Sequence, residues 1–171
     1  MYAARAENLF HLFRSAAPTL LGVMGVLLLA SPIRLAQGYV PTPLIPLVVV
    51  YFWSIYSPAS LPAFGVFLIG IFHDLMTGGP LGLWSTIYLF TYYIVVSQRT
   101  YFQGRDQQVV WLGFITVSAI ASLILWGVMS LLSGARLPIG DLVLQMLVTI
   151  ATYPVIAVFF AQFHRRILVE G

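Results

Sequence analysis

The stretch LPAFGVFLIGIFHDLMTGGPLGLWSTIYLFTYYIVV, residues 61–96, decides how this chain folds. Two apolar runs flank a break at Gly78, Gly79 and Pro80. We predict that Gly78 caps the first helix in the left-handed conformation, that Gly79 accepts the place before a proline, and that Pro80 opens the second helix. Because the break is short, the two helices are expected to be antiparallel neighbours.

The composition places both helices in a membrane. Hydrophobic residues make up 60% of the chain and charged residues 8%, against roughly half and a quarter in a soluble domain. At about 20 residues per span, the 171 residues suit about six crossings and leave no room for a soluble domain. We therefore predict an all-α protein with one polytopic membrane domain, whose spans cover about 18–33, 44–56, 62–76, 82–96, 109–132 and 142–163.

The N-terminal residues 1–30 superficially resemble a secretory signal peptide, with charge before an apolar run. No clear small-x-small cleavage site follows Leu29, so we interpret this run as the first span. Residues ahead of it suit either a short interfacial helix or a disordered tail.

Prolines shape two of the other spans. The second span lies in PLIPLVVVYFWSIYSP, residues 43–58, and its prolines predict an irregular start that other helices shield. Pro154 predicts a kink in the last span. The carbonyl that Pro154 frees is expected to find a donor on a neighbouring helix or on the Thr149 hydroxyl.

Residue types exclude several kinds of chemistry. The chain has no cysteine, so disulfides and thiolate sites are excluded, and its net charge of +3 is too small and scattered for nucleic-acid binding. The motifs GxSxG, HExxH and GxxxxGK[ST] are missing. We expect no enzyme, no cofactor and no metal.

His73 and Asp74 form the one titratable pair inside an apolar run, and a titratable group in a membrane helix is a functional candidate. Asp74 lies near the expected outer interface, where hydration makes its charge less costly. Adjacent helix positions point about 100° apart, which disfavours a catalytic dyad. We expect Asp74 to pair with Arg34 or Arg136, or to cap the turn at residues 77–79, and His73 to pack between helices.

Aromatic residues near the span ends suit a membrane girdle, and these are Tyr39, Tyr56, Trp84, Tyr101 and Trp111. Tyr88 and Tyr92 lie deeper and share one helix face. We expect them to pack in the core, where a hydroxyl could hydrogen-bond to a neighbouring helix.

The stretch from Pro43 to Tyr93 resembles the bacterial rod shape-determining protein MreD family. The resemblance lies in the proline-flanked, aromatic-rich helix ending in YFWSIYSP and in the helix that closes in HDLMTGGPLG. The positions that carry over, with an architectural role, are Pro58, Gly70, Asp74, Gly78, Pro80 and Gly82.

The resemblance implies a non-enzymatic subunit of the bacterial inner membrane. Such a subunit binds the single-span protein MreC and, with MreB filaments, a RodA-type glycosyltransferase and a class B penicillin-binding transpeptidase, directs side-wall peptidoglycan synthesis. It also implies the six-helix fold of the substrate-binding subunits of energy-coupling-factor vitamin transporters.

Two other functions compete with this scaffold. The first is a vitamin-binding transporter subunit, which the implied fold favours, but the first span lacks the AxxxA docking pattern and the outer half has few polar side chains. The second is an intramembrane enzyme that uses Asp74 with His73, which would need converging polar groups from another helix.

The arginine distribution predicts that both termini are cytoplasmic, because basic residues are enriched in cytoplasmic loops. Arg34 and Arg136 alone fall on the outer side, whereas the cytoplasmic segments carry Arg5, Arg14, Arg99, Arg105, Arg165 and Arg166. A fluorescent reporter fused to the C-terminus should therefore mature in the cytoplasm. A C-terminal fusion that is active only on the outer face would contradict this orientation.

Overall fold

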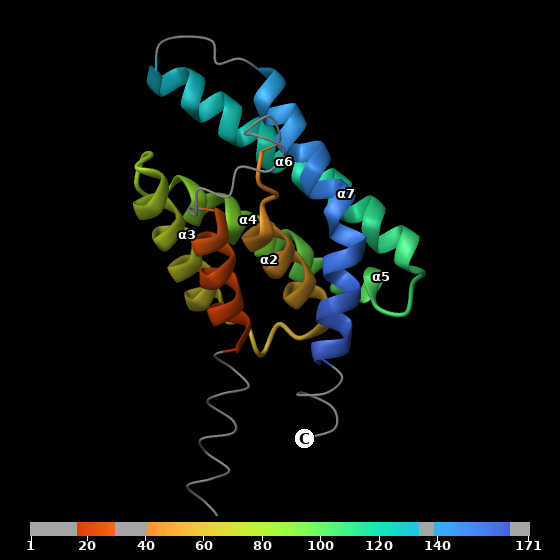
Figure 1. The fold of residues 1–171 in the computed structure, drawn as a ribbon. Coiled ribbons are helices and arrows are strands. Elements are labelled where there is room, and N and C mark those ends of the chain that lie inside the picture. The colour runs from red at the N-terminus through yellow and green to blue at the C-terminus, as the bar shows by residue number, and fades with distance from the viewer. Residues whose placement is uncertain (1–16, 30–40, 134–138, 165–171) are drawn as a thin grey trace, which may run out of the picture.

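The computed structural model describes residues 17–29, 41–133 and 139–164, and every regular element within these ranges is a helix (Figure 1). The all-α prediction is confirmed for these residues. The expectations for residues 1–16, Arg34, Tyr39 and Arg136 lie outside the described residues. The helices are Ala17–Leu29, α2 Ile45–Tyr56, α3 Ala63–Thr77, α4 Leu83–Ser97, α5 Arg99–Phe102, α6 Gln107–Ser133 and α7 Ile139–His164.

Helix length separates these elements into two groups. Segments Gln107–Leu132 of α6 and Ile139–Gln162 of α7 are long and apolar enough to cross a membrane, by length and composition. The helices α2, with 12 residues, and α3 and α4, with 15 each, are apolar but shorter. At 1.5 Å per residue they extend about 18–23 Å, against about 30 Å of hydrocarbon. Within the described ranges, two helices thus meet the requirement for a full span.

Helix α2 forms the core of the molecule. All ten residues from Pro46 to Ile55 are buried, because neighbouring helices, α4 and α7 above all, surround it (Figure 1). The hydroxyl of Tyr51 donates to the carbonyl of Val110 on α6 at 2.8 Å, and the ring packs edge-on against Phe114 and Tyr153. A largely apolar helix that is surrounded in this way needs no polar face.

Glycines set the approach of the Ala17–Leu29 helix to its neighbours. A Cβ at Gly25 would lie 3.0 Å from the side chain of Ile45, at the start of α2. A Cβ at Gly22 would overlap the side chain of Ile69 on α3. The absence of a side chain at these two glycines therefore allows the close helix contact.

The proline-rich start of α2 depends on side chains from α7. The amide of Leu44 donates to Thr149 Oγ1 at 3.0 Å, and Gln145 Nε2 donates to the carbonyl of Thr42 at 3.3 Å. Leu44 itself has a non-helical conformation, with φ −74° and ψ 70°. The prediction of an irregular start shielded by another helix is confirmed.

Pro154 lies inside α7 and deprives the carbonyl of Ile150, four residues earlier, of its helical donor. Trp111 Nε1 on α6 donates to that carbonyl at 3.1 Å. The freed group therefore finds its donor on a neighbouring helix. The alternative donor, the Thr149 hydroxyl, donates to the carbonyl of Gln145 instead. The kink at Pro154 stays a prediction.

The bond from Trp111 can be tested through its dependence on Pro154. Replacing Trp111→Phe should lower the free energy of unfolding by about 1 kcal/mol, because the carbonyl of Ile150 loses its donor. In a Pro154→Ala background the restored backbone N–H takes over, so the same replacement should cost clearly less. Equilibrium unfolding in mixed micelles measures both costs, and equal costs in the two backgrounds would contradict the assignment.

Candidate functional site

The turn between α3 and α4 gathers polar groups at one end of the bundle. Asp74 is 1% exposed and His73 2% exposed, although both lie in an apolar helix. The expectation that water relieves the charge of Asp74 is wrong, because protein groups enclose the carboxylate. A buried carboxylate is stable only where donors replace its hydration.

Asp74 caps the helix that follows its own. Its Oδ2 accepts from the amide of Gly82 at 2.8 Å, and its Oδ1 accepts from the amide of Trp84 at 3.0 Å. These amides belong to the first turn of α4, where unpaired N–H groups and the helix dipole favour a negative charge. Ser85 Oγ lies 3.5 Å from Oδ2, at the limit of a hydrogen bond. The carboxylate therefore joins α3 to the start of α4.

The turn at residues 77–79, which the side chain of Asp74 was expected to cap, is capped by other groups. The side chain of Asp74 bonds to residues 82 and 84, whereas its backbone carbonyl accepts from the amide of Gly78 at 3.0 Å. Thr77 Oγ1 donates to the carbonyl of His73 at 2.9 Å. Backbone and threonine groups thus satisfy the end of α3, which leaves the carboxylate free for α4.

The conformation of the turn confirms one prediction and corrects another. Gly78 is left-handed, with φ 66°, and ends α3 as expected. Pro80 does not open α4, so that prediction is wrong: α4 begins at Leu83, after Gly82 with φ 94°. Pro80 instead begins a turn in which its carbonyl accepts from the amide of Leu83 at 3.3 Å. The hydrogen bond from the Gly82 amide to Asp74 stabilises this start of α4 at Leu83.

His73 ties the two helices together through its ring. The ring stacks on the indole of Trp84, with centroids 4.2 Å apart and planes 11° from parallel, and Nδ1 lies 2.6 Å from the Tyr88 hydroxyl. The prediction that His73 packs between helices is confirmed, as is the buried hydroxyl contact of Tyr88. Trp84, expected in a membrane girdle, is 8% exposed and belongs to this packing.

The remaining residues that the resemblance singled out lie in two parts of the structure. Gly70 lies beside this site, because a Cβ there would overlap the backbone of Ser85. Gly79 has open space around it, with only Thr77 Oγ1 near its Cβ position, at 3.9 Å. Pro58 lies at the far end of α3, where its carbonyl accepts from Leu61. The structure thus brings together Gly70, Asp74 and Gly82, and it leaves Pro58 apart.

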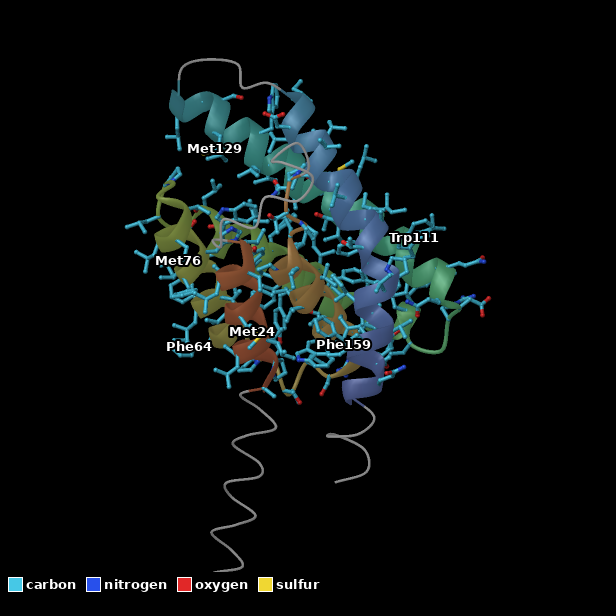
Figure 2. All side chains as sticks on the ribbon, in the orientation of Figure 1. Met24, Phe64, Met76, Trp111, Met129 and Phe159 are labelled. Atoms are coloured by element: carbon cyan, nitrogen blue, oxygen red, sulfur yellow. The ribbon has the colours of Figure 1, made fainter. Side chains whose placement is uncertain are left out.

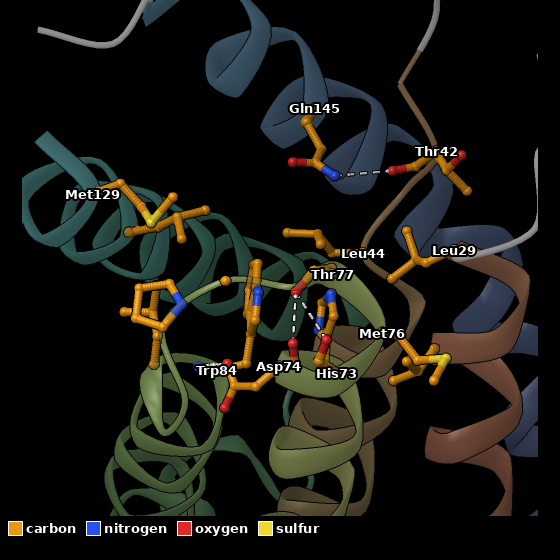
Figure 3. A pocket seen from close by; sticks show the side chains of 15 residues that line it. Leu29, Thr42, Leu44, His73, Asp74, Met76, Thr77, Trp84, Met129 and Gln145 are labelled. Carbon is orange, nitrogen blue, oxygen red and sulfur yellow. Dashed lines mark hydrogen bonds between the residues drawn. The ribbon is translucent and has the colours of Figure 1, made fainter. Parts of the chain in front are cut away.

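A cavity of about 350 Å³ opens beside the turn (Figure 3). The ends of α3 and α4 contribute its polar wall with His73, Asp74, Thr77 and Trp84, and Gln145 of α7 lies on the opposite side. Apolar side chains from the other helices complete the lining, among them Val26, Leu29, Leu44, Leu125 and Met129. Sequence reasoning missed Gln145, although an amide inside an apolar run was a usable signal.

The described part of the chain holds no group of three His, Cys, Asp or Glu residues that could bind a metal ion. Both oxygens of Asp74 are occupied by amides, and no described bond joins Asp74 to His73. What this arrangement does chemically is to neutralise a buried helix terminus.

The cap predicts a graded response to mutation. Replacing Asp74→Ala should lower the free energy of unfolding by about 3 kcal/mol, because two buried amides lose a charged acceptor. Asp74→Asn keeps one acceptor oxygen and should cost less. Asp141→Ala, an exposed carboxylate in the first turn of α7, is the matched control and should cost under about 1 kcal/mol. Unfolding in mixed micelles measures all three, and an Asp74→Ala cost no larger than the control would exclude the capping role.

Comparison with known proteins finds no relative of this chain. No protein family model matches the chain, no curated protein matches it, and no solved structure matches it.

Proposed function

We propose that this protein is a six-helix subunit of the bacterial inner membrane that acts as a non-enzymatic scaffold in the cell-elongation complex. In this proposal it binds a single-span protein of the MreC kind. Through that protein it works with MreB filaments, a RodA-type glycosyltransferase and a class B transpeptidase to direct side-wall peptidoglycan synthesis.

The observation that carries the proposal is the structure of the HDLMTGGPLG segment. Its carboxylate caps a helix, its Gly78 and Gly82 adopt left-handed conformations, and Gly70 gives α3 and α4 close contact. These contacts support the architectural role that the resemblance implies for each position. A rigid hairpin whose charge is used internally suits a docking scaffold better than a catalytic centre.

The outer surfaces of the helices favour a lipid environment. Large apolar side chains project from α3, α6 and α7 and from the Ala17–Leu29 helix; Met24, Phe64 and Phe159 are labelled in Figure 2. Phe64 is 68% exposed and Phe159 61%. Soluble monomers rarely expose apolar surface on so many elements. In the proposed membrane α4 packs along α2, and a bilayer can thin locally to match such short helices.

The arrangement of the helix ends agrees with cytoplasmic termini. The start of the Ala17–Leu29 helix and the end of α7 lie at the same end of the bundle (Figure 1). The connection that carries Arg99 and Arg105 lies at this end too, because Gln103 Nε2 donates to the carbonyl of Ile55 at the end of α2. The α3–α4 turn lies at the opposite end, which is the outer face in this proposal.

Photocrosslinking in native membranes tests the scaffold. A photoreactive residue placed at Phe64 or Phe159 should capture a single-span protein, because both side chains are exposed to the bilayer. The same residue at Ile69, which is fully buried, is the matched control and should capture no other protein. Recovery of transporter ATPases without a single-span partner would contradict the scaffold, as would rod-shaped growth after the protein is depleted.

A further inference from the structure

The cavity beside the α3–α4 turn is large enough to hold a small molecule. Its volume of about 350 Å³ falls in the range of small-molecule pockets, which begins at about 300 Å³. Five helices and the chain ahead of α2 contribute to its lining, so the site exists only in the assembled bundle. Most of its lining is apolar, with a few polar groups on one wall.

Two ring nitrogens on that wall have bonding capacity left over. His73 bonds through Nδ1, and among the described residues neither His73 Nε2 nor Trp84 Nε1 has a hydrogen-bond partner. Neither nitrogen is among the fully buried side-chain atoms that lack a partner in the described residues, and both residues line the cavity. Stacking at 4.2 Å holds the two rings in fixed positions.

The bond to Tyr88 assigns the proton of His73. The Tyr88 hydroxyl is fully buried, and His73 Nδ1 is its one partner among the residues described. If Nδ1 carried the proton, the hydroxyl hydrogen would be left without an acceptor, which is costly in the core. We therefore assign the tautomer in which Tyr88 donates to Nδ1 and Nε2 carries the proton. His73 and Trp84 then both offer an N–H donor to the cavity.

From this wall we infer that the cavity binds a small uncharged molecule that carries a carbonyl oxygen, of the amide or ester class, on an apolar body. The two N–H donors match an acceptor oxygen and disfavour an ammonium group, which is itself a donor. The carboxylate of Asp74 lines the same wall and disfavours an anion. No described arginine lines the cavity to offset that charge. This inference does not rest on the proposed scaffold function.

Three probes that share a benzene ring but differ in charge test the inference. Benzamide is neutral, benzoate is an anion and benzamidine is a cation, and each can be titrated into the full-length protein in nanodiscs. Benzamide should bind with a dissociation constant of roughly 0.1–10 mM, and the two charged analogues at least tenfold more weakly. The signal of the His73 imidazole in nitrogen NMR should shift on saturation with benzamide.

The same chemistry could come from a lipid ester, so mono-oleoylglycerol forms a second arm. Binding of benzamide without the glyceride assigns a water-soluble ligand, and binding of the glyceride alone assigns a bilayer ligand. Either result supports the site if the variants below respond. If neither neutral probe binds, or if benzoate or benzamidine binds as tightly as they do, the inference is overturned.

Two variants of α6 locate the binding. Leu125→Trp fills the cavity without touching the cap and should abolish binding. Leu123→Trp introduces the same ring two residues away, at a position 67% exposed, and should bind as the wild type does. His73→Phe keeps a flat ring but removes both nitrogens and should weaken benzamide at least tenfold. If His73→Phe does not fold, the Leu125 and Leu123 pair decides alone, and unchanged binding to Leu125→Trp overturns the site.

Discussion

A buried carboxylate sets the geometry of one end of this bundle. Asp74 leaves water almost completely, and this would cost several kcal/mol without compensation. The amides of Gly82 and Trp84 offset this cost, because they lie at the N-terminal end of α4, where the helix dipole is positive. The bonds can form only if α4 begins at Leu83. This constraint moves the start of α4 away from Pro80 and places the indole of Trp84 where the His73 ring can stack on it.

The same principle recurs wherever a proline interrupts a helix. At the start of α2 the hydroxyl of Thr149 accepts from Leu44, and in α7 the indole of Trp111 donates to the carbonyl that Pro154 frees. In each case a backbone group that has lost its partner finds one on another helix. Water cannot serve such groups inside a bilayer, so helices with prolines depend on close neighbours. Packing and hydrogen bonding are therefore not separable in this protein.

The two ends of the bundle differ in what they can do. Around Tyr51 and Phe160, aromatic rings pack densely between α2, α6 and α7. At the other end the helices leave a cavity, and its wall is built from the groups that the Asp74 cap has positioned. The proposed scaffold role draws on the hairpin, and the inferred ligand site draws on the cavity beside it.

Local features of the sequence were enough to predict much of the fold. Where the structure describes them, the apolar runs predicted all helices except the four-residue α5 to within a few residues. The Gly78 cap follows from backbone sterics that no neighbour can change. The sequence alone also predicts that Pro154 removes a backbone donor from its helix. It likewise predicts that the charge of Asp74 needs a partner.

Only the tertiary structure decided which groups meet. The capping of α4 by Asp74, the stacking of Trp84 on His73 and the place of Gln145 opposite them join residues from different helices. Hydrophobic periodicity says which residues are buried but not which neighbour each one meets, because apolar helices in a bundle can pack on one another in many ways. The cavity wall lies between such helices, so its chemistry emerged only when their packing was known.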